Sequence, residues 1–192
     1  MTGDPEKKRA TPTRSLQREV GPREPMVPEG DTRERLVCPE CRFVEYANPK
    51  VVVGAVVRWQ GRIVLCRRAI PPRRGFWTIP AGYLELNETA QAGALREALE
   101  EAEARIELDG LIAVYNIPRL SQVQLIFRAQ LLDGRIGSGP ESEEAAFFAW
   151  DEIPWDDIAF PSTRWALRHY REIGEAAEFV TRGNPPGELG DY

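Results

Sequence analysis

The sequence predicts an α/β (α+β) fold in which a mixed β-sheet lies between helices. Two observations indicate this fold class. Short Val-rich or alternating segments, typical of strands, stand on both sides of an Ala- and Leu-rich segment with helical periodicity, and a second helical segment follows later. At 192 residues, of which 42% are hydrophobic, the chain is long enough for one domain of roughly 100 to 150 residues with a substantial core, plus extensions.

The beginning of the chain is predicted to lack a packed core. Residues 1–35 are rich in Pro, Arg and Glu and poor in large apolar residues, which is typical of a disordered N-terminal extension. Residues 36–49 contain a C-x-x-C knuckle, Cys38 and Cys41, shaped like half of a zinc ribbon. Structural zinc takes four ligands, usually from two such knuckles, and a second knuckle is absent. We interpret residues 36–49 as a degenerate zinc-ribbon remnant; substitute carboxylate ligands and a zinc site shared by two chains are alternatives.

The next segment is predicted to form a β-hairpin. Residues 50–59 are rich in Val, Gln60-Gly61 suits a tight turn, and residues 62–67 return as a second strand. The Pro- and Arg-rich residues 70–75 must then form a loop. Residues 76–80, Phe-Trp-Thr-Ile-Pro, form a short apolar segment that we expect to pack in the core.

Residues 89–105 are predicted to form an amphipathic helix. Thr89 is a suitable N-cap, and the segment contains no Pro. At about 100° per residue, Glu97, Glu100 and Glu101 share one face, opposite an apolar stripe. Like charges at these spacings repel each other, and a hard divalent cation such as Mg²⁺ would reverse the sign of that interaction. A metal site is therefore one interpretation of this face, and a solvated acidic surface is the other.

Two strands are predicted after this helix, at residues 111–117 and 122–132. The second alternates clearly between apolar and polar side chains, as expected for a strand whose two faces meet different surroundings. Its apolar face carries Val123, Leu125, Phe127, Ala129 and Leu131, and its polar face carries Gln122, Gln124, Arg128 and Gln130.

The last part of the domain is predicted to contain one loop, one strand and one helix. Residues 133–144 are rich in Gly and acidic at their end, which is typical of a loop, and residues 145–150 are strand-like. Residues 161–170 are predicted to be helical, and residues 173–192 to form a C-terminal tail that is frayed from about Gly183.

The spacing of Gly and charged residues around the first helix resembles the box of the Nudix hydrolases. That box reads Gly, five residues, Glu, seven residues, Arg-Glu, an apolar residue, any residue, Glu-Glu, any residue, Gly and an apolar residue. Glu103 stands where the family has a final Gly, a residue that favours helix termination. The resemblance implies a Nudix α/β/α sandwich with a mixed β-sheet over residues 50–172. The matching positions are Gly82, Glu88, Arg96, Glu97, Glu100 and Glu101.

Other stretches resemble the Nudix branch that includes the plant chloroplast FAD pyrophosphatase and related bacterial proteins with an N-terminal zinc ribbon. The similar stretches are residues 35–54, 75–85, 139–142, 152–155 and 159–162. Without gaps, the first cysteine pair of that branch would fall at Leu16 and Glu19, so this chain lacks it. The resemblance implies metal-dependent hydrolysis of the pyrophosphate bond of ADP-ribose or FAD, with release of AMP. Alternatives are an NADH pyrophosphatase that also removes NAD caps from RNA, and a non-catalytic domain that senses a nucleotide.

The resemblance also assigns roles to the residues of the box. Glu97, Glu100 and Glu101 are expected to bind Mg²⁺ or Mn²⁺, and Glu97 is also counted among the catalytic groups. The carbonyl oxygen of Ala81 is expected to be a further ligand. Gly82, Glu88 and Arg96 are expected to maintain the geometry of the box, with Arg96 and Glu88 paired to fix the loop against the helix.

Residues outside the box are expected to complete the site. In several Nudix enzymes a Glu on a distant loop assists as a base. Glu144 is the first candidate here and Glu141 the second, and solvated loop acids are the alternative for both. Arg68 and Arg119 are expected to contact the phosphate or ribose of the substrate, although Arg is common on protein surfaces.

Composition limits the partners and the compartment. A net charge of −5 with both signs mixed along the chain argues against a nucleic-acid partner and leaves a small nucleotide as the expected one. The longest early apolar run is too short to span a bilayer, and the first residues lack the apolar core of a signal peptide. Three Cys indicate no disulfide framework, so we predict a cytoplasmic protein without a membrane partner. A homodimer is a possible assembly, for which the ribbon remnant offers a surface.

Overall fold

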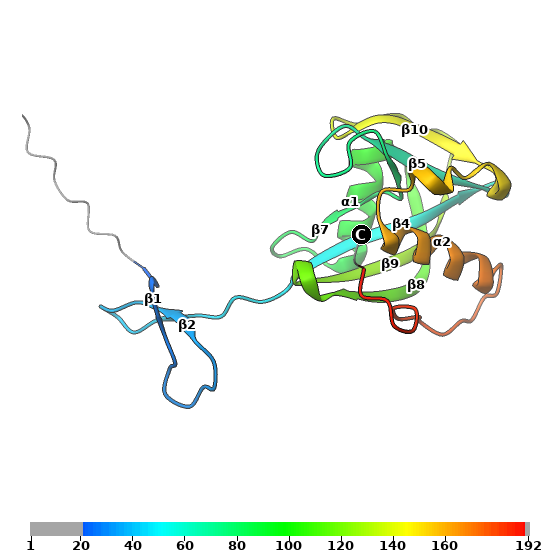
Figure 1. Ribbon diagram of the computed structural model, residues 1–192. Helices are drawn as coiled ribbons and strands as arrows, with labels where there is room; N and C mark the ends of the chain where they lie inside the picture. The colour runs from blue at the N-terminus through cyan, green and yellow to red at the C-terminus, as the bar shows by residue number, and fades with distance from the viewer. Residues whose placement is uncertain (1–20, 191–192) are drawn as a thin grey trace, which may run out of the picture. The chain divides into compact units, whose positions relative to one another are not determined.

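The computed structural model describes residues 21–190 and divides the chain into two compact units, with the boundary after Ala47. The first unit is a small antiparallel sheet in the order β1-β2-β3 (Figure 1). Its strands are β1 Glu24–Met26, β2 Arg35–Val37 and β3 Val44–Glu45. No helix within the described residues is long and apolar enough to cross a membrane.

Regular structure is found before the boundary that the sequence predicts at residue 35. Strand β1 lies wholly inside the predicted extension, and it is held by backbone pairing with β2 and not by an apolar core. Asp31 supports the intervening turn, because its carboxylate accepts hydrogen bonds from the backbone N–H groups of Thr32 and Arg33. Composition missed this sheet because the buried hydrophobic residues among residues 21–47 are Val37 and Cys38. The rest of the predicted extension, residues 1–20, lies outside the described residues.

The second unit is built on a seven-stranded mixed sheet whose main path runs β10-β5-β4-β9-β8, with β6 paired to β5 and β7 paired to β4. The central pair, β4 and β9, is parallel, and the other pairs are antiparallel. The strands are β4 Lys50–Trp59, β5 Arg62–Arg68, β6 Trp77–Thr78, β7 Ala81–Tyr83, β8 Ile106–Ile117, β9 Gln122–Leu131 and β10 Ser142–Phe148. Short 3₁₀ helices lie at η1 Pro118–Leu120, η2 Trp150–Glu152 and η3 Trp155–Asp157.

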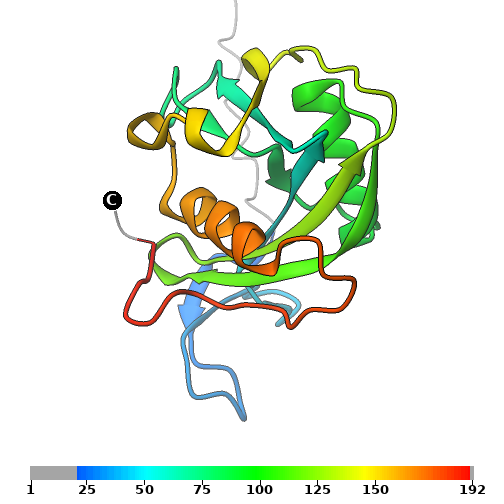
Figure 2. The same cartoon turned by 90° about the vertical axis from the view of Figure 1, so that its right-hand side faces the viewer.

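Two helices cover opposite faces of this sheet (Figures 1 and 2). Helix α1, Ala90–Ala102, packs Ala94 and Ala98 in one core cluster with Val53 of β4. Helix α2, Pro161–Ile173, packs Trp165 in a second cluster with Val56, whose side chain points the other way from β4. The predicted mixed sheet between helices, an α/β/α arrangement, is thus confirmed.

Helix α1 begins as predicted and ends at a residue with a strained backbone. The Thr89 side chain accepts a hydrogen bond from the Ala92 N–H at 3.1 Å. At the other end, Glu103 adopts the left-handed conformation at φ 49°. The Glu103 N–H donates to Leu99 O and the Ala104 N–H donates to Ala98 O, at 3.0 and 3.1 Å. The bond from Glu103 to Leu99 is that of an αL C-cap, formed here without the usual Gly.

The predicted frayed tail is wrong for the described residues after α2. Strand β8 is an edge strand with backbone groups left to pair, and the tail supplies partners for them. The Arg182 N–H donates to Ile112 O and the Val114 N–H donates to Arg182 O, at 2.8 and 2.9 Å. Asn184 exchanges two side-chain hydrogen bonds with the Asn116 backbone, both at 2.8 Å. Figure 2 shows this segment running beside the sheet below α2.

Candidate active site

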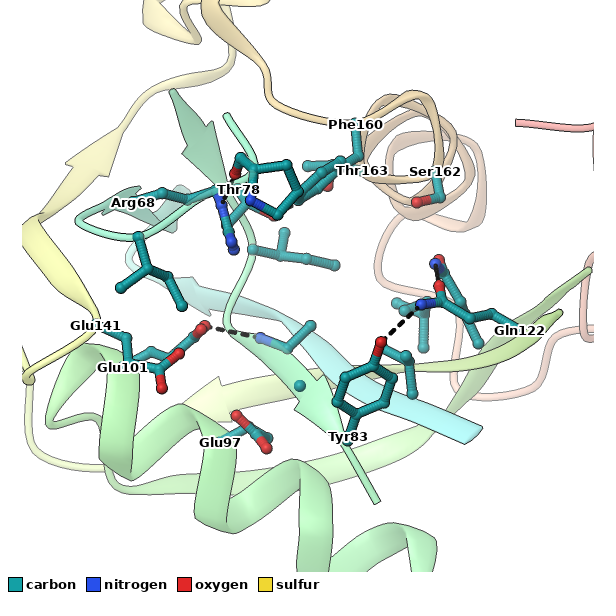
Figure 3. A pocket seen from close by; sticks show the side chains of 18 of the residues that line it. Arg68, Thr78, Tyr83, Glu97, Glu101, Gln122, Glu141, Phe160, Ser162 and Thr163 are labelled. Carbon is teal, nitrogen blue, oxygen red and sulfur yellow. Dashed lines mark hydrogen bonds between the residues drawn. The ribbon is translucent and has the colours of Figure 1, made fainter. Parts of the chain in front are cut away.

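A cavity of about 740 Å³ opens between helix α1, the β4–β9 face of the sheet and the start of helix α2. Figure 3 shows the carboxylates of Glu97, Glu101 and Glu141 at one end, and the Tyr83 and Gln122 side chains at the other. The structure thus brings residues far apart in the sequence into one acidic wall and one polar wall.

Glu101 is the most deeply buried acid of this wall. It is 7% exposed, and its carboxylate accepts one hydrogen bond, at 2.9 Å, from the Ala81 N–H. Burial raises the pKa of Glu101 from its ordinary value of 4.5 to about 7, and the nearby negative charge of Glu97 adds to the increase. A carboxylate in this environment gains if a cation replaces the lost water.

Glu97 lies one helical turn earlier and is also 7% exposed. Burial raises its pKa, although the Arg96 guanidinium opposes the shift through a 2.7 Å hydrogen bond. A Cβ atom on Gly82 would lie 2.4 Å from both oxygens of this carboxylate. The first Gly of the box is therefore needed because Glu97 occupies the space of a side chain.

Arg96 joins the loop, the strand and the helix. Its guanidinium makes two hydrogen bonds to the Glu88 carboxylate, at 2.9 and 3.0 Å, and donates to the Tyr83 carbonyl at 3.0 Å. Its Nη1 atom also donates to Glu100 Oε2 at 3.0 Å. Arg96 thus occupies the position predicted from the box, with Glu88 as its partner against the helix.

The donor set on the acidic wall fits a hard divalent cation. The groups are carboxylate oxygens, which Mg²⁺ and Mn²⁺ prefer. Burial raises the pKa values of two of these carboxylates, those of Glu97 and Glu101. Within residues 21–190, no group of three or more His, Cys, Asp or Glu side chains is placed to hold a metal ion. Mg²⁺ usually takes one or two carboxylates and completes its shell with water and substrate phosphates. Ala81, whose carbonyl was predicted as a further ligand, lines the cavity, and its N–H donates to the Glu101 carboxylate.

The structure separates the two acids predicted as general base. Glu141 lines the cavity, and its charge adds a smaller contribution to the burial that raises the pKa values of Glu97 and Glu101. Glu144 lies in β10 opposite Arg67, is exposed, and is not among the residues that line the cavity. Strand β10 begins at Ser142, earlier than predicted, and it places Glu144 outside the cavity that Glu141 lines.

The two predicted substrate-binding arginines also lie in different places. Arg68 lines the cavity, donates from Nε to the Pro72 carbonyl at 2.8 Å and lies 5.1 Å from the centre of the Phe160 ring. Arg119 lies exposed in η1 and does not line the cavity, although its neighbour Leu120 does. Of the two predicted arginines, Arg68 lines the cavity and Arg119 does not.

The polar wall was not identified as a site from the sequence. Tyr83, Gln122 and Gln124 line the cavity from strands β7 and β9, and Thr163 lines it from the first turn of α2. The alternation of residues 122–132 placed both glutamines on a polar face. The sequence does not show that both faces of this sheet are covered, and for that reason it does not show that the polar face of β9 lines a cavity.

The ribbon unit does not fit a zinc ion held by one chain. Cys38 is buried and Cys41 is exposed, and the chain's third cysteine, Cys66, is buried in the second unit. The Cys38 thiol donates to the Glu40 carboxylate at 3.1 Å. Glu40 is in turn paired with Arg23, at 2.7 Å. One chain thus supplies two of the four ligands that structural zinc needs, and one of these thiols is already hydrogen-bonded to a carboxylate.

Comparisons with known proteins agree with this geometry. The family model described as "NUDIX domain" matches residues 48–169, and the model described as "Nudix N-terminal", for a zinc ribbon, matches residues 21–47. A Nudix hydrolase from Nitrosomonas europaea has a crystal structure that is 47% identical. Its alignment covers 83% of this chain and 91% of that one, with a TM-score of 0.78.

Two curated relatives are similar over shorter stretches. A MutT-like protein of Streptomyces ambofaciens is 38% identical over 53% of this chain, and an ADP-ribose pyrophosphatase of Methanocaldococcus jannaschii is 27% identical over 57% of it. The chain spans 64% and 67% of the lengths of these two relatives. The box, the sandwich fold and the family match over residues 48–169 lead to one conclusion: the chain belongs to the Nudix hydrolase family.

Proposed function

We propose that the protein hydrolyses the pyrophosphate bond of a nucleoside diphosphate linked to a second group, with ADP-ribose or FAD as the substrate and AMP as a product. The observation that carries the proposal is the buried acidic wall, Glu97 and Glu101 with Glu141 facing them, in a cavity of about 740 Å³. The M. jannaschii relative, an ADP-ribose pyrophosphatase, supports the choice of substrate, as does the resemblance to the FAD pyrophosphatase branch.

The residues present suggest how the cation is held. Glu97, Glu100 and Glu101 would bind Mg²⁺ or Mn²⁺ at the acidic wall, with Ala81 beside them. When bound, the cation neutralises the diphosphate oxygens and makes water a better nucleophile. Arg96 fixes the side chains of Glu97 and Glu100 through hydrogen bonds of 2.7 and 3.0 Å, so the wall keeps its shape before the substrate enters.

Other residues of the chain orient the reaction. Water adds to one phosphorus, the bridging P–O bond breaks, and AMP leaves together with the phosphorylated second group. Glu141 is the group to which we assign acceptance of the water's proton, because it is the acid outside the box that faces Glu97 and Glu101. Arg68 lines the same cavity and supplies positive charge near the diphosphate.

A panel assay tests the proposal. Purified protein with Mg²⁺ or Mn²⁺ is incubated with ADP-ribose, FAD, NADH, NAD⁺ and nucleoside triphosphates, and AMP and FMN are separated by chromatography. Release of AMP from ADP-ribose or FAD supports the proposal and identifies the second group. Preference for NADH would support the alternative NADH pyrophosphatase. Binding of a nucleotide by calorimetry without turnover would instead favour a sensor.

A further inference from the structure

The polar wall of the cavity carries two glutamine side-chain amides, which lie among apolar side chains. Gln122 and Gln124 project from β9 on the face that also presents Ile126, and all three line the cavity. Tyr83 of β7 and Gln124 of β9 both pair in register with Val52 of β4, so the three residues form one row across the strands. All members of this row line the cavity.

Three polar side chains of this wall are linked by a series of hydrogen bonds. Gln124 Nε2 donates to Gln122 Oε1 at 3.3 Å, and Gln122 Nε2 donates to the Tyr83 hydroxyl at 3.2 Å (Figure 3 shows the second bond). This chain of bonds uses one N–H of each amide. The oxygen of Gln124 and the second N–H of each amide still have capacity to bond a ligand.

A flat heterocycle matches this surface. Its apolar faces suit the neighbouring Val52, Ile117 and Leu120 side chains, and its polar edge needs a donor and an acceptor side by side. A glutamine amide presents that pair of groups to the edge of adenine, where an amino group lies beside a ring nitrogen. An amide among apolar side chains is costly to leave without a hydrogen-bond partner, and a bound base would supply that partner.

We propose that Gln124 and Gln122 bind the edge of the adenine base and set the preference for adenine nucleotides. This inference rests on the proposed function, because it places the adenosine half of ADP-ribose or FAD at the polar wall and the diphosphate at the acidic wall. The two walls lie at opposite ends of one cavity, as the substrate's chemistry requires.

The test compares ADP-ribose with its deaminated form, in which the amino group of adenine is replaced by a carbonyl oxygen. The native protein is expected to have a kcat/KM roughly tenfold higher for ADP-ribose, and Gln124→Leu to lose most of that preference mainly through KM. Gln130→Leu is the matched control. Gln130 lies on the same strand and donates to the Leu131 carbonyl, but it does not line the cavity.

Two results separate this inference from the proposed function. An unchanged preference in Gln124→Leu and Gln122→Leu, with normal hydrolysis by the native protein, would overturn the inference and leave the function standing. If the native protein hydrolyses neither compound, calorimetry with AMP and IMP replaces the kinetics. Tighter binding of AMP than IMP that disappears in Gln124→Leu supports the inference, and equal affinities or an unaffected preference would overturn it.

Discussion

Arg96 donates two hydrogen bonds to Glu88, from Nε to Oε1 at 2.9 Å and from Nη2 to Oε2 at 3.0 Å. Glu88 Oε2 also accepts the backbone N–H of Glu85 at 3.1 Å, so the pair ties a turn of the preceding loop to the helix. The same guanidinium reaches Glu97 and the Tyr83 carbonyl. The Arg96 side chain therefore fixes the position of the acidic wall relative to strand β7.

Replacing Arg96 with Lys should reduce turnover while leaving the protein folded. Lys keeps the charge but cannot form the planar fork that holds Glu88 in two places. Because small displacements of catalytic groups are costly, we expect kcat to fall on the order of 10- to 100-fold. Circular dichroism and steady-state kinetics with the preferred substrate test this. Arg105→Lys, an exposed change just beyond α1, is the control, and equal activities in both variants would contradict the alignment role.

The buried state of Glu101 predicts how stability depends on pH in the absence of metal. Its pKa is raised to about 7 by burial, whereas the unfolded chain has the ordinary value of 4.5. Between these values the folded protein keeps a proton that the unfolded chain releases, so the free energy of unfolding falls as pH rises. At about 1.36 kcal/mol per pKa unit, the fall has an upper limit of ~3 kcal/mol. Urea unfolding with chelator at pH 5 and pH 8 measures it.

The Glu101→Gln variant should remove most of this pH dependence and be more stable than the native chain at pH 8 without metal. It should also lose turnover on the order of 100-fold or more, since an amide is a poor ligand for a hard cation. Gain of stability with loss of activity would be the mark of a buried carboxylate kept for metal binding. A variant that keeps the full pH slope would show that another group titrates.

Glu141 and Glu144 give a matched pair for the general base. Glu141→Gln should lower kcat about 100-fold, because its carboxylate lines the cavity together with Glu97 and Glu101. Glu144→Gln should leave kcat within about twofold, since that side chain lies outside the cavity. A larger effect at Glu144 than at Glu141 would restore the order that the sequence predicts.

Replacing Glu103 with Gly should stabilise the protein. Glu103 holds φ at 49°, a conformation that disfavours residues with a Cβ atom. Part of the gain is lost because Gly makes the unfolded chain more flexible, so we expect a net stabilisation of about 0.5–1 kcal/mol and a Tm increase of roughly 1–4 °C. Glu103→Ala, which removes the carboxylate but not the strain, is the control. An equal gain in that variant would place the effect in the side chain.

The ribbon unit is expected to contain far less than one zinc per chain after purification with zinc present. Two thiols are too few for a structural site, and the Cys38 thiol already bonds the Glu40 carboxylate that Arg23 neutralises. Elemental analysis alongside the Cys41→Ser variant tests this. A full equivalent that Cys41→Ser abolishes would contradict the expectation. Half an equivalent together with a dimer in solution would instead indicate a site shared by two chains.

The sequence predicted best where one local pattern determines the structure. The helical segment of α1 and its Thr89 cap are set by residues within a few positions of each other, and both were confirmed. The predicted separation of an acidic face from an apolar stripe was wrong, because Glu97 and Glu101 are buried on the same face as Ala98 whereas Leu99 is exposed. The position of Glu141 depends on how a loop meets the helix, through a close approach of Gly139 to the Glu100 carbonyl that no local pattern encodes. The tail was misjudged for the same reason, because its partner is the distant edge of β8.

Gly82 and Gly139 limit how this chain can diverge. At Gly82 an added Cβ atom would meet the Glu97 carboxylate at 2.4 Å, and at Gly139 it would lie 1.6 Å from the Glu100 carbonyl oxygen. Neither glycine has a positive φ, so each is required for the space it leaves and not for a left-handed backbone. A methyl group at Gly82 would displace the Glu97 carboxylate, and one at Gly139 would displace the backbone of α1 beside Glu101, so the shape of the acidic wall depends on two residues that have no side chain.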